Sequence, residues 1–543
     1  MLVPPSGKSR MASEIAPGPS TDSPPFFSRA PLPLLGLGAL ACAVYAFAEW
    51  SLLGGRFGFP LDDSWIHLQF ARNLANGAGL SYNPGELVTG STAPLWTALL
   101  SLLYLLPAST VVVGAKLLGT ALHLAGIDAV WRLARALEIG RRGAALAAFL
   151  FLATPWMVWS ALSGMEIPLF ILLSLWGILL HIAERAERRD PGGPPLSLPL
   201  FAVAALARPE GFLLLALAVL DRLAAWTPIP LRRLAAGLAL AALAVAGPLL
   251  FYRWAGGSFL PTTFTAKGGG HPHWLAPNLQ YLQTVLGIFF EPQPWMTLAA
   301  GAGALTLAGR LGTERDRGLL PALWLAGLPL AYSFLTPGAS RMVGNFGRYY
   351  FPLFPLLIVL GVLGLQSAAR ALSRVLPSGS RTVLAGLAAL LLVAPTLARF
   401  PRGAALYAQN VANVEDSDVL LGRWLGERLS PDAVLAVNDI GAIKYLLPNR
   451  IIDLASIASP DVGREVARDM AMGVPRDQAM VAAIERRKPD YIAVFPRWVP
   501  GIGHDARFTP VFSLPIPGNI TMGDDQIVVY ATPWTRFPLR TVP

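Results

Sequence analysis

The chain has 543 residues with a formal net charge of +10; 54% of its residues are hydrophobic but only 14% are charged. Soluble domains carry about 25% charged residues, so this composition, with a mean hydropathy of +0.51, indicates a protein embedded in a lipid bilayer. Apolar runs recur between residues 31 and 398, and they are too continuous for the alternating strands of a membrane barrel. The sequence therefore predicts a polytopic α-helical membrane protein.

The positive charge sits mainly in arginine clusters between the apolar runs, where it sets the orientation of a membrane protein. No basic patch with interleaved aromatic residues stands out, so we expect no nucleic-acid partner. The single cysteine, Cys42, excludes an intramolecular disulfide and a cysteine-based metal site. Residues 1–30 are rich in Pro and Ser and are predicted to be a disordered cytoplasmic N-terminus without a cleavable signal.

The first apolar run, Pro31–Leu53, follows several basic residues, so the N-terminus is predicted to be cytoplasmic. Residues 54–108 then form a first outer loop that contains the adjacent acids Asp62 and Asp63. Within this loop the apolar run Pro94–Leu106 is too short to cross a bilayer, which needs about 20 residues. If it crossed, the arginines that follow the next span would lie outside, so we expect it to stay at the outer surface.

The same rule, applied along the chain, predicts about 11 spans, an external C-terminus and a multi-pass protein of the plasma (inner) membrane. Leu196–Ala207 and Gly211–Ala225 form either one interrupted helix or a hairpin around Arg208-Pro209-Glu210, and the hairpin keeps the later arginines inside. Residues 255–293 are expected to be an outer loop. The other expected spans are Thr110–Trp131, Gly143–Leu162, Pro168–Ile182, Leu234–Trp254, Pro294–Ala308, Leu319–Leu335, Tyr350–Leu365 and Val383–Ala398.

Residues 399–543 have the composition of a soluble domain, which the topology places outside the cell. Short β-type runs alternate with helical segments, and this predicts a small sheet with helical cover. The segment from Trp498 to Gly523 is rich in Gly and Pro and is expected to be surface loops. The expected strands are Ala433–Val437, Arg450–Leu454, Tyr491–Phe495 and Gln526–Tyr530.

Every predicted outer loop contributes ionisable residues, and these are candidates for a shared site. A carboxylate can deprotonate an acceptor hydroxyl, while Arg or Lys can neutralise a phosphate leaving group. A divalent cation such as Mg or Mn on Asp62 and Asp63 is a further hypothesis, since hard cations prefer oxygen ligands. The candidates are Asp62, Asp63, Glu166, Arg208, Glu210, Lys267, His271, Arg348 and Tyr349.

Each candidate also has a structural interpretation. Arg208 before Pro209 is typical of the end of a helix, and Glu166 is typical of the start of one. Lys267 lies among glycines, as in a solvated loop, and His271 is a weak metal candidate. Arg348 beside Tyr349 is typical of an anchor at the membrane interface.

Several of these segments resemble one family. Asp62-Asp63-Ser64-Trp65-Ile66, Asn83-Pro84-Gly85-Glu86 and Pro94-Leu95-Trp96 resemble the first outer loop of GT-C glycosyltransferases, especially arabinofuranosyltransferases that use a polyprenyl-phosphate sugar. Gly164–Phe170, Arg208-Pro209-Glu210-Gly211 and Gly347-Arg348-Tyr349 resemble later motifs of that group, in the same order.

The resemblance implies an inverting transfer of a hexosyl or pentosyl group from a polyprenyl-phosphate donor to a glycan, lipid or protein acceptor. It makes Asp62 or Asp63 the general base, with Asp62 preferred. Asp63 and Glu166 would orient the sugar or bind a cation, while Arg208, Lys267 and Arg348 would hold the phosphate. The alternative is a transporter or flippase of a lipid-linked or anionic substrate; the absence of internal repeats and the location of the acids in loops favour the enzyme.

Overall fold

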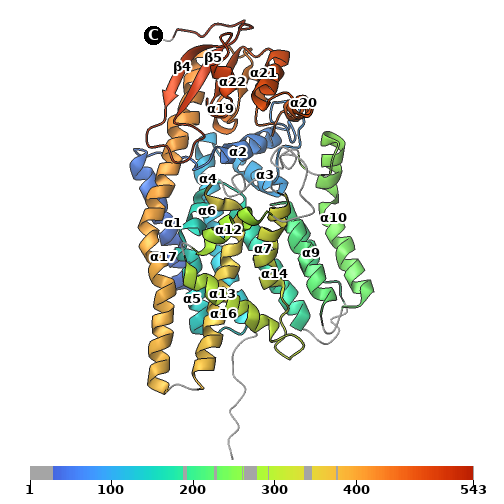
Figure 1. Cartoon of the computed structure of the whole chain (residues 1–543), viewed down its shortest axis with the longest axis vertical. Coiled ribbons are helices and arrows are strands. Elements are labelled where there is room, and N and C mark those ends of the chain that lie inside the picture. The colour runs from blue at the N-terminus through green and yellow to red at the C-terminus, as the bar shows by residue number, and fades with distance from the viewer. Residues whose placement is uncertain are drawn as a thin grey trace, which may run out of the picture.

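A bundle of long helices carries a smaller α/β domain at one end, and a single helix, α17, runs along both parts (Figure 1). The segment predicted to be disordered, residues 1–30, falls almost wholly outside the described part of the chain. The computed structural model describes residues 28–186, 193–225, 229–259, 261, 278–290, 293–335, 345–374 and 377–541.

Each of the eleven segments expected to span the membrane contains helix. One of them, residues 143–162, is split into two helices at Thr154, before Pro155. The helices are α1 (Leu32–Leu52), α4 (Val111–Ala136), α5 (Arg141–Ala153), α6 (Pro155–Leu162), α7 (Ile167–Ala186), α8 (Ser197–Ala205), α9 (Glu210–Leu223), α10 (Leu231–Gly256), α13 (Pro294–Ala308), α14 (Leu320–Leu335), α16 (Phe354–Leu372) and α17 (Ser378–Val414).

Six helices of the described chain are long and apolar enough to cross a bilayer, and the pair α5 and α6, bent by 56°, would make a seventh. The chain is thus a multi-pass membrane protein, while the total of about 11 spans stays a prediction. The α8–α9 hairpin is confirmed, because Arg222 near the end of α9 donates a 2.9 Å hydrogen bond to the Ser197 hydroxyl at the start of α8. The two helices therefore run up and back rather than as one interrupted helix.

The segment 255–293, expected to be an outer loop, contains a helix near its C-terminal end. Helix α12 (Leu279–Phe290) occupies this end and buries Tyr281, Val285 and Phe289, which recur every four residues on one face. With only 12 residues it is too short for a span, so a search for long apolar runs does not detect it.

Two short helices of the first loop lie across the end of the bundle, beneath the α/β domain (Figure 1). They are α2 (Asp62–Ala75) and α3 (Pro94–Ser101), which a short 3-10 turn extends to Leu105. The Trp96 indole donates a 3.0 Å hydrogen bond to the Gly164 carbonyl, and the Leu95 amide donates one of 3.1 Å to the Leu206 carbonyl. Helix α3 is thereby held against the α6–α7 and α8–α9 turns.

The C-terminal domain contains a five-stranded sheet in the order β2-β1-β3-β5-β4. Strands β1, β2 and β3 are parallel, whereas β5 pairs antiparallel with both β3 and β4. This confirms the predicted α/β fold. The elements are α18 (Leu420–Arg428), β1 (Leu435–Val437), α19 (Gly441–Leu446), β2 (Ile451–Asp453), α20 (Pro460–Ala471), α21 (Arg476–Arg487), β3 (Tyr491–Val494), α22 (Pro500–Gly503), β4 (Thr509–Pro515) and β5 (Gln526–Ala531).

Strand β4 lies in the segment that was expected to be loops. It begins and ends near Pro510 and Pro515, and it is an edge strand, the position in which a sheet tolerates proline. The prolines, which are unfavourable in a central strand, therefore led the sequence analysis to predict loops where an edge strand is present.

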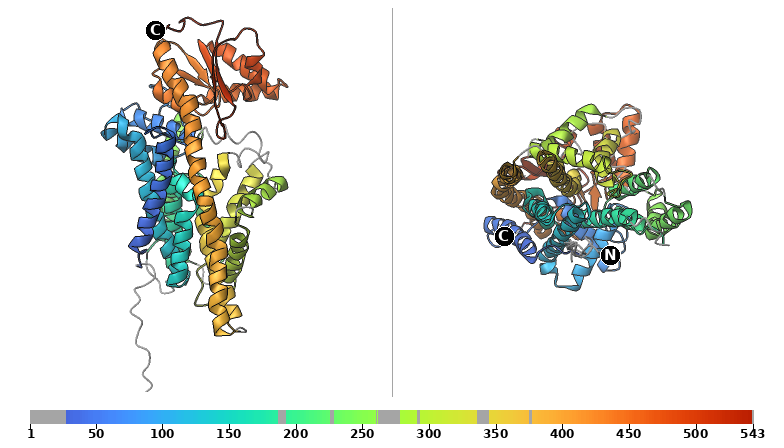
Figure 2. Two further views of the ribbon diagram at one scale, coloured as in Figure 1. Left: turned by 90° about the vertical axis from the view of Figure 1, so that its left-hand side faces the viewer. Right: turned by 90° about the horizontal axis from the view of Figure 1, so that it is seen from below.

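The predicted boundary at residue 399 falls inside α17, a helix of 37 residues. At a rise of about 1.5 Å per residue this helix is about 55 Å long, and it passes from the bundle into the α/β domain (Figure 2). It continues into a π-helical turn, Glu415–Val419, before α18 begins. The two parts are consequently joined by continuous helix and not by a flexible linker.

The first loop is also part of the α/β domain's core. Ile66, Phe70 and Tyr82 belong to the same hydrophobic cluster as Leu435 and Tyr491 on the sheet. The side chain of Asn83 both accepts from the Ile451 amide and donates to the Ile451 carbonyl, each at 3.0 Å, so it covers the outer edge of β2.

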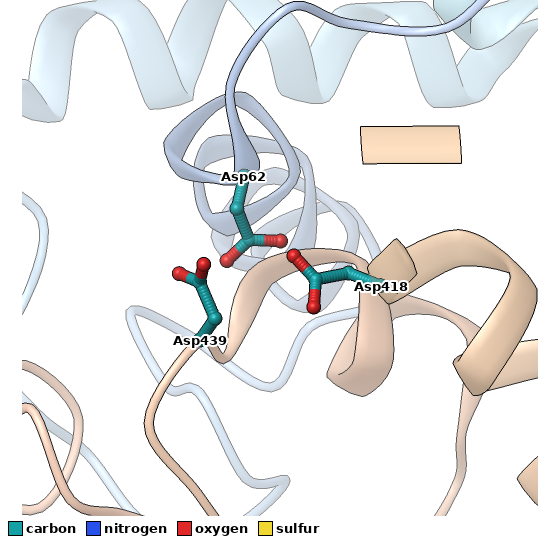
Figure 3. Close-up of side chains that lie close together, drawn as sticks. All are labelled: Asp62, Asp418 and Asp439. Carbon is teal, nitrogen blue, oxygen red and sulfur yellow. The ribbon is translucent and has the colours of Figure 1, made fainter. Parts of the chain in front are cut away.

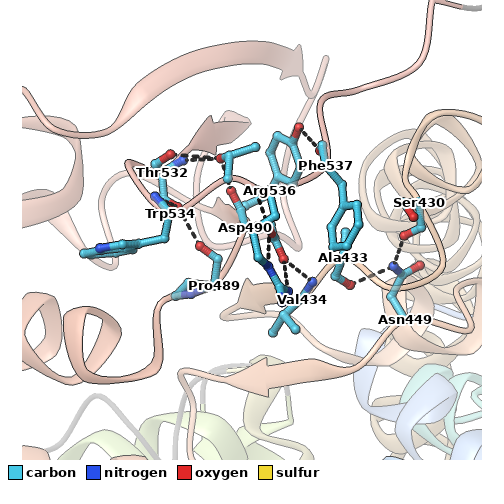
Figure 4. A network of polar contacts seen from close by, with 12 residues as sticks. Ser430, Ala433, Val434, Asn449, Pro489, Asp490, Thr532, Trp534, Arg536 and Phe537 are labelled. Atoms are coloured by element: carbon cyan, nitrogen blue, oxygen red, sulfur yellow. Dashed lines mark hydrogen bonds and ion pairs between the residues drawn. The ribbon is translucent and has the colours of Figure 1, made fainter.

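Directly before β3, the buried Asp490 fastens the C-terminal tail (Figure 4). Its carboxylate accepts hydrogen bonds from the Val434 amide at 2.8 Å and from the amide and guanidinium of Arg536 at 2.8–3.1 Å. Burial raises the pKa of Asp490, but the bonds from Arg536 and Val434 outweigh it and hold that pKa below its usual value.

We expect Asp490→Asn to lower the free energy of unfolding at pH 7 by about 1–3 kcal/mol, because an amide offers one acceptor oxygen where the carboxylate uses two. A depressed folded-state pKa gives stability that is present above the unfolded pKa of about 3.9 and is lost as the pH falls through the folded value. Thermal unfolding between pH 7 and pH 3 should therefore show a shallower pH dependence in the variant. Asp525→Asn, at an exposed carboxylate, is the matched control; equal slopes for Asp490→Asn and the wild type would contradict the assignment.

Candidate active site

A salt-bridge network joins two turns at the end of the bundle near the α/β domain. Arg208, between α8 and α9, binds Glu166 of the α6–α7 turn at 2.7 Å and Glu210 at 2.6 Å. Glu210 also accepts a 2.6 Å hydrogen bond from the Tyr332 hydroxyl of α14. All of these side chains are nearly or fully buried, so the network fixes the relative positions of the α6–α7 turn, the α8–α9 turn and α14.

A second ion pair lies beside the first. Arg348, in the 3-10 segment Asn345–Leu353 that leads into α16, binds the carboxylate of Asp63 on α2. Both arginines lie over the ring of Tyr349, with the Arg208 and Arg348 guanidinium carbons 5.2 and 5.5 Å from its centroid. Arginine over an aromatic ring is a favourable cation–π arrangement.

His67 connects the two ion pairs from α2. It lies one helical turn after Asp63, and its Nε2 is 3.2 Å from Glu166. We use the name charged cluster for these side chains together, which come from five separate segments of the chain: Asp63, His67, Glu166, Arg208, Glu210, Tyr332, Arg348 and Tyr349.

Glu166 and Arg208 are held in their ionised forms by other members of the charged cluster. Burial raises the pKa of Glu166, but the hydrogen bond from His67 and the charge of Arg208 outweigh burial and lower it to about 2. Burial lowers the pKa of Arg208, while Glu210 and Glu166 raise it well above its usual value. Both groups thus stay charged at neutral pH.

One donor atom of the charged cluster, Nη1 of Arg348, is buried without a hydrogen-bond partner among the described residues. Buried donors are nearly always satisfied, so this guanidinium can take a further acceptor. A phosphate oxygen has the charge and the acceptor capacity that suit such a donor.

Asp62 points to a different place from Asp63. Its carboxylate accepts hydrogen bonds from the Gly441 and Ala442 amides at 2.6 and 2.7 Å, at the start of α19 in the α/β domain. Successive residues of an α-helix are rotated by about 100°, so neighbouring acids on α2 face different partners. The sequence reading preferred Asp62 as the base, whereas the structure brings Asp63 into the charged cluster.

The different directions of Asp62 and Asp63 also bear on the hypothesis that these two acids hold one cation. Among the described residues, the carboxylates that gather around Asp62 are those of Asp418 and Asp439, and Asp63 is not among them (Figure 3). Lys267 and His271 lie outside the described residues.

Two members of the charged cluster, His67 and Tyr332, were missed by the sequence reading. His67 had a usable signal, since its spacing of four from Asp63 places both on one face of a helix. Tyr332 had none, because an isolated tyrosine in an apolar helix is ordinarily a core residue.

Replacing Arg208 should expose how strongly the network depends on it. We expect Arg208→Met to destabilise the folded protein by about 3–5 kcal/mol, because Glu166 and Glu210 would then be buried without their cation. The double variant Arg208→Met/Glu166→Gln should recover part of this loss, since it removes one of the unpaired charges. Thermal unfolding of the detergent-solubilised chain measures both effects; strictly additive losses would contradict a direct interaction.

Comparison with known proteins adds two kinds of finding. A family model described as a domain of unknown function, DUF8728, matches residues 404–532, which include the whole sheet. No curated protein sequence matches the chain.

Solved structures give similarity over almost the entire chain. ArnT from Cupriavidus metallidurans in the apo state has a TM-score of 0.59 at 14% identity, covering 92% of this chain and 97% of that protein. The same ArnT bound to undecaprenyl phosphate has a TM-score of 0.57 at 14% identity, covering 91% and 98%. The Archaeoglobus fulgidus oligosaccharyltransferase in the apo form has a TM-score of 0.54 at 13% identity, covering 93% and 75%. At these identities the likeness is one of fold: the chain shares the fold of ArnT and of the archaeal oligosaccharyltransferase.

Proposed function

We propose that this protein is a glycosyltransferase that moves a sugar from a polyprenyl-phosphate donor to an acceptor of the cell envelope. The observation that carries the proposal is the charged cluster, in which two buried arginines, one of them with an unpaired donor atom, lie near a carboxylate on α2. The GT-C fold supports it, as does the ArnT structure that contains undecaprenyl phosphate.

The arginines would bind the donor phosphate. Nη1 of Arg348 is buried and unpaired among the described residues, and Arg208 lies over the same Tyr349 ring. Glu166 and Glu210 hold Arg208 from two sides, so they would position this guanidinium without touching the donor. Preorganised cations of this kind stabilise the charge that develops on a phosphate leaving group.

Asp63 is the general base in this proposal. It is a quarter exposed, whereas both oxygens of Asp62 are occupied by backbone amides. The acceptor hydroxyl would give its proton to Asp63 as its oxygen bonds to the anomeric carbon. The bond from that carbon to the phosphate oxygen would break, and the lipid phosphate would leave with the electron pair, which inverts the anomeric centre.

Binding of the donor phosphate would also release Asp63 from its ion pair with Arg348. In the free protein Arg348 is bound to Asp63. A phosphate that competes for the same guanidinium would weaken this pair and free a carboxylate oxygen for the incoming hydroxyl. The base would then become available only when the donor is in place.

The reaction would occur at the outer face of the membrane, with the N-terminus cytoplasmic and the α/β domain extracytoplasmic. The arginine distribution between the helices supports this orientation. Lys267 and His271 remain predicted donor ligands of the loop that follows α10. A glycan, a lipid and a protein are all chemically suitable acceptors, because each offers a hydroxyl or amide nucleophile.

The base assignment is tested in membranes that contain the full-length protein, with synthetic polyprenyl-phosphate sugars radiolabelled in the sugar. We expect Asp63→Asn to reduce transfer into envelope material by about 10²–10⁴-fold, the usual contribution of a general base. Asp62→Asn should lose less than about 10-fold per folded molecule, because its carboxylate lies outside the charged cluster.

Glu86→Gln is the matched control, since Glu86 is in the same loop but pairs with the exposed Arg450. Full transfer by Asp63→Asn, with Asp62→Asn inactive, would return the base to Asp62. Accumulation of labelled lipid in a counterflow assay, without any glycosylated product, would favour a transporter instead.

A further inference from the structure

Three carboxylates meet where the first loop contacts the α/β domain (Figure 3). Asp62 begins α2, Asp418 lies in the π-helical turn after α17, and Asp439 follows β1. One oxygen from each lies within 4.8 Å of the other two. We use the name aspartate triad for this group, which draws on the membrane bundle and on the α/β domain.

Asp418 is the member that a purely structural role does not explain. It is fully buried, and neither of its carboxylate oxygens has a hydrogen-bond partner among the described residues. Its side chain points toward Asp62 (Figure 3). An unpaired buried carboxylate is costly, so such a group calls for a specific counterpart.

The counterpart is not a basic side chain. In the described ranges, no Lys, Arg or His forms an ion pair with any member of the aspartate triad. Three carboxylates gathered this closely repel one another when they are ionised, and a bound cation would offset that repulsion.

We propose that the aspartate triad binds a divalent cation that prefers oxygen ligands, with calcium the best fit. Oxygens bound to one calcium ion at 2.3–2.6 Å are at most about 5 Å apart, which matches the spread of the triad. The triad consists of carboxylates alone, without a nitrogen or sulfur ligand that zinc or copper would favour. Asp439 is only partly buried, so the ion can enter from solvent and retain water ligands.

The ion would act as a clamp between the two parts of the chain. Asp62 comes from the loop beside Asp63, while Asp418 and Asp439 come from the α/β domain, so one ion would join all three. This site is separate from the charged cluster, and its existence does not depend on which reaction the charged cluster performs.

The experiment uses the full-length protein, stripped with chelator and held in a neutral detergent. We expect calcium, and to a smaller extent magnesium, to raise the thermal transition of the wild type by about 5 °C, because an ion that binds the folded state stabilises it by mass action. Asp418→Asn should lose this increment. Asp416→Asn, an exposed acid of the same turn, should keep it.

Equilibrium dialysis with radioactive calcium gives an independent readout. One ion per wild-type chain that is lost in Asp439→Asn supports the clamp, and this arm serves if Asp418→Asn does not fold. The proposal is overturned if the wild type binds no calcium, or if Asp418→Asn retains the same cation-dependent increment as the wild type. Neither measurement involves sugar transfer, so failure of the clamp and failure of the enzymatic proposal are distinguishable.

Discussion

The rotation of about 100° between successive helical residues decides the arrangement around the first loop. Two acids that adjoin in sequence begin α2, and they cannot serve one site. One faces the α/β domain and meets the start of α19, while the other faces the membrane helices and meets Arg348. Helix α2 therefore links the contact with α19 to the charged cluster through consecutive residues, and a shift of either one moves the other.

Much of the architecture could be predicted because lipid imposes a strict pattern on sequence. Long apolar runs and the arginines between them placed all eleven expected spans on helices, and the alternation of short runs indicated the α/β domain. The misses share a physical cause. Helix α12 is too short to meet the length of a bilayer, and strand β4 carries prolines that only an edge position allows.

The candidate site was predictable in composition but not in grouping. Arg208, Glu166 and Arg348 were recognised because charge beside an apolar span is expensive. The choice between Asp62 and Asp63 depends on the direction of each side chain, which local sequence does not specify when both flanking surfaces are buried. Asp418 and Asp439 lie more than 350 residues from Asp62 in the chain, so only the fold reveals their association.

The side-chain amide of Asn83 forms the hydrogen bonds that a neighbouring strand would form with the outer edge of β2, because it supplies both a donor and an acceptor. An uncovered edge invites pairing with another copy of the same sheet. The first loop thus covers the edge of β2 and also contributes aromatic residues to the core of the α/β domain. Without this loop, the α/β domain is an incomplete folding unit. A recombinant fragment that starts within α17 would expose both surfaces, and we expect it to self-associate.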